Sequence, residues 1–248
     1  MSRALGTLVL AAALFAGGAS ARPVAQGSSL TVFAASSLTD AFPKIDRSAR
    51  YSFAGSNALA AQIRLGAPAG VFASANLALP RGLFKSRLCS KPVAFARNAL
   101  VLIVPSSNPA NIQTVYDLRK PGVKLVIAAP GVPVGSYTLQ VLKRMKLTSV
   151  LSHVVSRESD VREVLAKVAL NEADAGFVYS TDARTVPRKV RALRIPARAR
   201  PNVQYGICVV SARSHKAAAR AFVKRVLRKA GQKILIRYGF LPRVRPRR

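Results

Sequence analysis

The sequence predicts an α/β protein whose sheets are mainly parallel. Short runs of strand-forming residues alternate with helical patterns along almost the whole chain, and this alternation is typical of parallel sheets flanked by helices. Small or hydroxyl residues stand at five of the strand-to-helix junctions. The length of 248 residues, half of them hydrophobic, allows one large domain or two smaller lobes.

The first junction follows the apolar run 30–33 and passes through small residues into a helix. Ser37 fits the N-cap of this helix, and Asp40 fits the acidic partner of a capping box. Pro43 predicts that the helix is short or kinked. A helix N-terminus carries partial positive charge and suits an anion, although Ser37 would serve equally well if it only capped its own helix.

Later elements repeat this arrangement. A strand at 50–53 leads through a small-residue turn to Ser56 and a helix over 58–65. Ser159 and Asp160 precede a helix over 161–168 whose apolar residues recur at helical spacing. The other predicted strands are 71–73, 99–104, 124–129, 154–155, 175–179 and 203–210. The other predicted helices are 114–118, 138–145, 215–229 and 231–238. Ligands of such sheets bind at the carboxyl ends of the strands, so the junctions near 37, 56, 134, 161 and 179 are expected to meet.

The N-terminus has the pattern of a cleaved export signal, residues 1–21. Arg3 is followed by the apolar run 5–15 and by the small residues Ala19-Ser20-Ala21. No later segment reaches 18 consecutive apolar residues. We therefore expect an exported, periplasmic protein without a membrane span. Cys89 and Cys208 are the only cysteines; outside the cytosol they could pair, or each could be a core residue.

The charge is strongly basic. Lysine and arginine number 40 against nine acidic residues, which gives a formal net charge of +31. Such a field attracts anions, including nucleic acids. The basic residues are scattered through every predicted element apart from a terminal cluster at 243–248, and tryptophan, zinc-finger and RNA-binding motifs are absent from the sequence. We therefore expect no nucleic-acid partner.

Catalytic and cation-binding patterns are also missing from the sequence. His153 and His215 are the only histidines, neither lies beside a nucleophile motif, and the acidic residues are scattered. Gly131 and Gly135 belong to no phosphate-binding loop, because no Gly-Lys-Ser/Thr follows. The sequence thus predicts no enzyme, no cofactor and no cation site. It leaves hydroxyls, a phenol and backbone N–H groups, which are neutral donors.

The chain resembles the periplasmic molybdate-binding proteins of ABC uptake systems. The matching stretches occur in the family's order at 31–39 (TVFAASSLT), 53–56 (FAGS), 132–137 (VPVGSY), 160–162 (DVR), 176–183 (GFVYSTDA) and 237–240 (RYGF). This resemblance implies two α/β lobes joined by crossing strands, with the ligand in the cleft between them. One lobe would comprise 28–96 plus 205–248, and the other 97–204.

The resemblance also implies a function and a set of contacts. The protein would be a monomer that captures molybdate, and tungstate as well, and delivers it to an ABC permease. The oxyanion would contact hydroxyls and N–H groups of Ser37 and Ser56, N–H groups of Val134 and Val161, and the phenol of Tyr179. Molybdenum would bind only as its oxyanion.

Donors alone suit a fully deprotonated tetrahedral dianion, whose oxygens only accept hydrogen bonds. A protonated phosphate needs an acceptor, and an unmet buried donor costs about 1–3 kcal/mol. Phosphate should therefore be rejected. Two alternatives remain open from the sequence: a receptor for sulfate or another oxyanion, and a secreted basic protein that binds anionic polymers.

Overall fold

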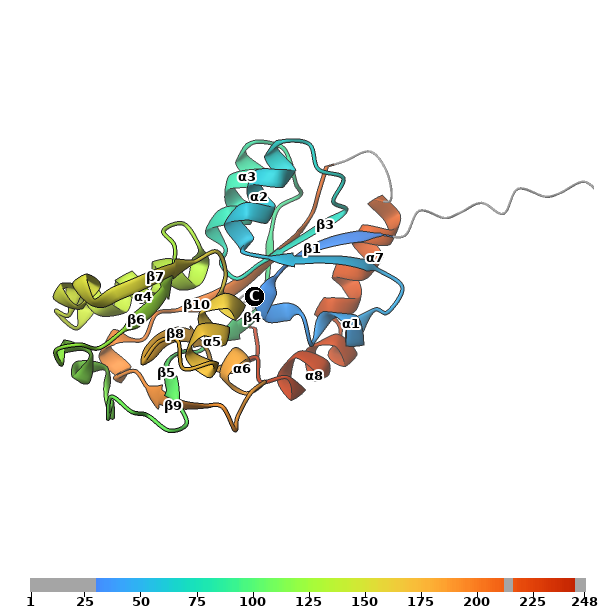
Figure 1. Ribbon diagram of the computed structural model, residues 1–248. Coiled ribbons are helices and arrows are strands. Elements are labelled where there is room, and N and C mark those ends of the chain that lie inside the picture. Colours follow the sequence, from blue (N-terminus) through green and yellow to red (C-terminus); the bar gives the residue numbers. More distant parts are fainter. Residues whose placement is uncertain (1–29, 212–215, 244–248) are drawn as a thin grey trace, which may run out of the picture.

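The computed structural model describes residues 30–211 and 216–243, which form two five-stranded sheets with helices around them. The predicted signal peptide, residues 1–21, lies outside the described residues, as does most of the basic C-terminal cluster. Figure 1 shows the two halves side by side, one in blue, cyan and red and the other in green, yellow and orange. Within the described residues, no helix is long and apolar enough to cross a membrane.

The first sheet has the order β2-β1-β3-β10-β4. Its strands are β1 (Thr31–Ala35), β2 (Arg50–Ala54), β3 (Val71–Ser74), β4 (Val93–Asn98) and β10 (Val203–Val209). The pairings of β1 with β2 and β3 are parallel, whereas β10 is antiparallel to both β3 and β4. Strand β10 therefore runs against the other four.

The second sheet repeats this arrangement in the order β7-β6-β8-β5-β9. Its strands are β5 (Leu100–Pro105), β6 (Leu125–Ala128), β7 (Val154–Glu158), β8 (Ala175–Tyr179) and β9 (Val190–Arg194). Strand β5 is antiparallel to β8 and β9, and the pairings of β6 with β7 and β8 are parallel. The predicted α/β fold with two mainly parallel sheets is confirmed.

The helices divide between the two halves. With the first sheet lie η1 (Ser36–Leu38), α1 (Phe42–Ile45), α2 (Ser56–Arg64), α3 (Ala78–Lys85), α7 (Lys216–Leu227) and α8 (Lys229–Arg237). With the second lie η2 (Val115–Arg119), α4 (Pro133–Arg144), η3 (Thr148–His153), α5 (Val161–Ala169), α6 (Ser180–Ala183) and η4 (Ala197–Ala199). Helix α5 buries Val161, Val164, Leu165 and Val168, as their spacing predicts.

The chain passes between the halves twice. Only Ala99 separates β4 of the first sheet from β5 of the second, and the chain returns between the end of β9 and the start of β10. The side chain of Asn98 lies at this crossing, where its amide Nδ2 donates to Thr181 Oγ1 at 2.9 Å. The crossing is therefore fixed by hydrogen bonds to the second half.

The predicted capping box at the first junction is wrong. Residues 36–38 form a 3₁₀ turn whose N-cap is Ala35, with no side-chain cap. Ser37 Oγ lies instead 2.8 Å from the phenol oxygen of Tyr205, and Asp40 pairs with Arg162. Both competing partners are more than 100 residues away in sequence, so local spacing could not reveal them. Helix α1 is short, as Pro43 predicts.

The two cysteines lie in one apolar cluster of the first half. Cys89 and Cys208 are both buried free thiols. A hydrogen bond with the Cys208 thiol lowers the pKa of Cys89. The two thiols are therefore neighbours in the core, and in the structure they are not joined.

Candidate functional site

The five positions singled out from the sequence line one small cavity between the two halves. Ser37 and Ser56 come from the first half, whereas Val134, Val161 and Tyr179 come from the second. The remaining lining residues are Ala35, Ser36, Ala54, Gly55, Ala75, Val132, Pro133 and Asp160. The cavity thus draws on the carboxyl ends of β1, β2, β6, β7 and β8, where ligands of such sheets bind.

Backbone N–H groups at helix starts face the same region. Ser56 and Val161 are the first residues of α2 and α5, and Val134 is the second residue of α4. The first N–H groups of a helix have no partner within the helix. They also carry the positive end of its dipole. Three helices therefore offer donors and positive potential to an anion here.

Two glycines allow the close approaches that bring these helix starts together. A Cβ on Gly135 would lie 2.5 Å from the carbonyl oxygen of Ala128, so only glycine lets α4 start so close to the end of β6. A Cβ on Gly55 would lie 2.3 Å from the carbonyl oxygen of Ser159. Gly55 and Ser159 belong to different halves, so the two backbones almost touch beside the cavity.

The two serines are buried and held by other groups. Ser56 is 1% exposed, and its Oγ accepts a hydrogen bond of 3.1 Å from the N–H of Ala75. Its own hydroxyl hydrogen is therefore left for another acceptor. Ser37 is 3% exposed and contacts the phenol of Tyr205. Ser56 can thus present a donor to the cavity, and Ser37 can do so when its oxygen accepts from Tyr205.

Tyr179 carries an unpartnered polar atom. Its side chain is 1% exposed, and its phenol oxygen has no hydrogen-bond partner in the part of the chain that the structure describes. Burial, reinforced by Tyr205, Tyr137 and Asp182, raises the pKa of Tyr179 well above its ordinary value. The phenol therefore stays protonated at neutral pH, and an unmet buried donor costs about 1–3 kcal/mol. A bound acceptor would remove that cost.

The one carboxylate at the cavity is engaged elsewhere. Asp160 caps α5, where its Oδ1 accepts from the N–H groups of Arg162 at 2.6 Å and Glu163 at 3.3 Å. Asp160 is therefore the N-cap of the helix that its position before 161–168 indicates. The carboxylate of Asp160 accepts from Arg162 and Glu163 and not from Val161, the first residue of α5. The N–H of Val161 is therefore not occupied by Asp160.

Arg162 joins the two halves next to the cavity. Its Nε donates to Oδ1 of Asp182 at 2.6 Å, and its Nη2 donates to Oδ2 of Asp40 at 2.5 Å. Asp182 belongs to the second half and is fully buried, whereas Asp40 belongs to the first. Burial raises the pKa of Asp182 to about 6, despite the opposing effect of Arg162. The guanidinium is thus occupied by two carboxylates.

The space enclosed at the cavity is small. It offers about 10 Å³ to the centre of a water molecule, which is roughly room for one water. A larger cleft of about 570 Å³ lies beside it, shares Ser37, and is lined by the cationic side chains of Lys44, Arg162, Arg184 and Arg237. The small volume of the cavity and the close approach of the Gly55 and Ser159 backbones show that the two halves are closed on each other around the site.

Several residues of this region were not identified from the sequence. Ser37 contacts Tyr205, which in turn accepts a hydrogen bond from Asn98. Ser56 accepts from the N–H of Ala75, and the halves are connected by the pair of Asp40 and Arg162. The sequence pattern predicts only a capping role for Asp40. Arg162 belongs to the matching stretch 160–162, but its partners and those of Tyr205 and Asn98 lie far away in the sequence.

The fold and the convergence of donors between two halves define a class of protein. The chain belongs to the bacterial extracellular solute-binding proteins, whose family profile matches residues 30–241. This assignment confirms the family resemblance and the prediction that the chain is not an enzyme.

Similar proteins narrow the class. The chain is 37% identical to the molybdate-binding protein ModA of Mycobacterium tuberculosis over 97% of both chains. It is 32% identical to the protein of that name from Haemophilus influenzae, over 87% of this chain and 91% of the other. In fold it is similar to the periplasmic molybdate-binding protein of Azotobacter vinelandii, with a TM-score of 0.75 and 24% identity over 87% of this chain and 100% of the other. The sulfate-binding protein SubI of Mycobacterium tuberculosis has a similar fold, with a TM-score of 0.77 and 19% identity over 88% of each chain.

Proposed function

We propose that this protein captures molybdate, and tungstate as well, and delivers it to an ABC permease. The observation that carries the proposal is the set of neutral donors that meets in one buried cavity. Ser37 and Ser56 face it from one half, and Val134, Val161 and Tyr179 face it from the other. The relatives named molybdate-binding proteins support the choice of anion.

The chemistry of the donors supports a fully deprotonated oxyanion. Molybdate oxygens accept hydrogen bonds and donate none, so each can meet hydroxyl, phenol and N–H donors. A protonated phosphate would need an acceptor, and the carboxylate of Asp160 is already engaged with backbone N–H groups. An unmet hydrogen-bonding group in this site would cost about 1–3 kcal/mol.

Capture would proceed by closure of two lobes, which we assign to 28–96 plus 205–248 and to 97–204. Donors from both lobes contact the anion only when the lobes are together, so the anion favours the closed state. We further propose that the protein acts as a monomer, after export to the periplasm and cleavage of residues 1–21.

Isothermal titration of the exported chain with molybdate, tungstate, sulfate and phosphate at 150 mM salt tests the proposal. We expect tight binding of molybdate and tungstate, weaker binding of sulfate and none of phosphate. Ser56→Ala should weaken molybdate binding by about 10- to 150-fold, because it removes a donor to a charged acceptor. Ser152→Ala changes an exposed serine outside the cavity and serves as the matched control. Equal binding of sulfate or phosphate, or an unchanged Ser56→Ala variant, would refute the proposal.

A further inference from the structure

The direction of one hydrogen bond decides whether Ser37 can serve the anion. Its hydroxyl oxygen lies 2.8 Å from the phenol oxygen of Tyr205, and either atom could be the donor. If Ser37 donates to Tyr205, its hydrogen points away from the cavity. If Tyr205 donates, the hydrogen of Ser37 stays free for a bound oxyanion. The neighbours of Tyr205 settle which of these holds.

The side-chain amide of Asn98 has only one possible orientation. Its Oδ1 lies 2.9 Å from the backbone N–H of Ala99 and 3.1 Å from Oγ of Ser180. A backbone N–H can only donate, so the atom that faces it must be the amide oxygen. The amide nitrogen therefore occupies the other side, where it donates to Thr181 at 2.9 Å and to the phenol oxygen of Tyr205 at 3.3 Å.

This orientation fixes the hydrogen of Tyr205. The phenol oxygen accepts from Asn98, and if Ser37 also donated to it, the buried phenol hydrogen would have no acceptor among the described contacts, whereas the hydrogen of Ser37 can point into the cavity. Tyr205 is fully buried, and burial raises its pKa well above the ordinary value, so the hydrogen is retained at neutral pH. Ser37 therefore accepts from Tyr205 and keeps its own hydrogen.

We propose that Asn98 and Tyr205 are positioning residues that make Ser37 a donor to the oxyanion. The relay runs from the N–H of Ala99 through Asn98 and Tyr205 to Ser37, with every step in one direction. It starts at the crossing between the two halves and ends in the cavity. This inference rests on the proposed function, because it assigns a role in binding the same anion.

A double-mutant cycle with Tyr205→Phe and Ser37→Ala tests the relay by titration with molybdate. Tyr205→Phe keeps the ring and removes the hydroxyl that orients Ser37, so affinity should fall roughly two- to tenfold. In the Ser37→Ala background the same change should have no effect, because no hydroxyl remains to be oriented. A purely structural role of Tyr205 would weaken binding equally in both backgrounds, and that result would overturn the proposal.

Asn98→Asp provides a second test of similar shape. A carboxylate at 98 can still accept from Ala99 but would also accept the phenol hydrogen of Tyr205. Ser37 would then donate to Tyr205 and turn its hydrogen away from the cavity. We expect Asn98→Asp to lower molybdate affinity more than Tyr205→Phe does. When Asn98→Asp is combined with Tyr205→Phe, its effect should shrink to that of the added charge alone.

Asn202→Asp is the matched charge control, since Asn202 is exposed and close to the start of β10. Equal losses from Asn98→Asp with and without the Tyr205 hydroxyl would overturn the relay. Should Tyr205→Phe fail to fold, comparison of Asn98→Asp in the parent and in Ser37→Ala decides the question in the same way. A parent protein that binds no molybdate would instead refute the proposed function.

Discussion

The bridge between Asp40 and Arg162 should control how long the anion stays bound. It joins the first half to α5, and its oxygen and nitrogen atoms lie 2.5 Å apart. The two side chains are 42% and 26% exposed, so solvent screens the pair and its contribution is about 1 kcal/mol. Opening of the halves must break this pair. Asp40→Asn should therefore raise the dissociation rate of molybdate about fivefold and change the association rate little.

Stopped-flow tyrosine fluorescence is a suitable assay, because the chain has no tryptophan and Tyr179 lines the cavity. Glu172→Gln is the matched control: it removes the same charge from the pair between Lys167 and Glu172, which lies within the second half. Removing one negative charge makes the protein more positive, which should slow the release of an anion. Faster release from Asp40→Asn therefore cannot arise from the change in net charge. An unchanged dissociation rate in Asp40→Asn would refute the reasoning.

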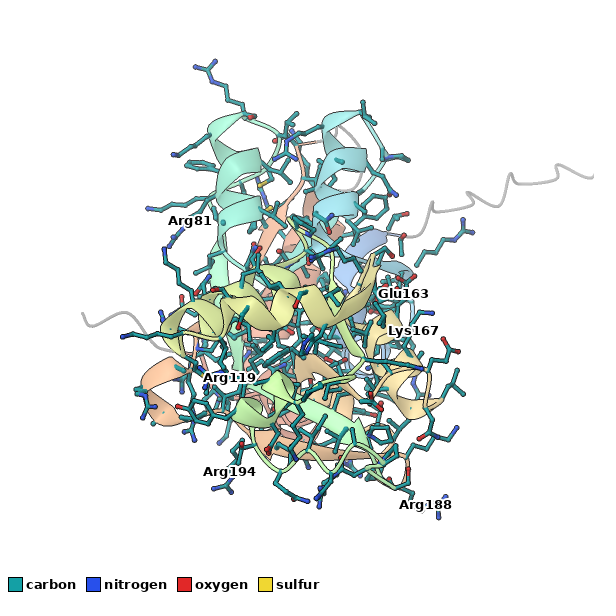
Figure 2. The ribbon with its side chains drawn as sticks, turned by 60° about the vertical axis from the view of Figure 1, so that its left-hand side comes forward. Arg81, Arg119, Glu163, Lys167, Arg188 and Arg194 are labelled. Carbon is teal, nitrogen blue, oxygen red and sulfur yellow. The ribbon has the colours of Figure 1, made fainter. Side chains whose placement is uncertain are left out.

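Three further predictions follow from the site and its surroundings. Tyr179→Phe should stabilise the ligand-free protein by about 1 kcal/mol in urea unfolding, because it removes an unpartnered buried hydroxyl, while molybdate affinity falls about tenfold or more; a loss of stability would contradict this. Burial raises the pKa of Asp182 to about 6, so its contribution to stability is present at pH 4 and is lost as the pH rises through 6. The free energy of unfolding of the parent relative to Asp182→Asn should thus fall by roughly 2 kcal/mol between pH 4 and pH 7, and a flat difference would show that Asp182 titrates normally. Added salt should slow molybdate association strongly, since cations such as Arg81, Arg188 and Arg194 project outward from the molecule (Figure 2); in Asp40→Asn, which has no bridge left for salt to screen, dissociation should change little, and a several-fold faster release in that variant would place cations in the site.

Much of the fold follows from local pattern in the sequence. The buried runs at β1, β6 and β8 and the helical spacing of α5 are visible without any partner. Strand β9 was missed because Val190–Arg194 is mostly exposed and carries two arginines, so it lacks an apolar run. Helix α3 was missed because Ala78–Lys85 contains a proline and a glycine, which usually interrupt helices.

The site divides in the same way. Its five positions stand at junctions between strands and helices. Small and hydroxyl residues in the sequence indicate where these junctions are, and the family resemblance implies their role in binding. The groups that orient them could not be predicted. Tyr205 lies 168 residues from Ser37, and Ala75 lies 19 residues from Ser56. Such contacts depend on how strands from separate segments are ordered in a sheet, and neither composition nor periodicity encodes that order.

The neutral character of the site is consistent with a chain that carries 40 basic residues. A cation in the cavity would attract any anion, and it would do so from one half alone, whether the halves were open or closed. Fixed neutral donors are individually weak, so an anion must reach both halves to gain enough hydrogen bonds. Arg162, the cation next to Val161, is neutralised by Asp40 and Asp182. Its charge holds the halves together, and the choice of anion is left to the geometry of the donors.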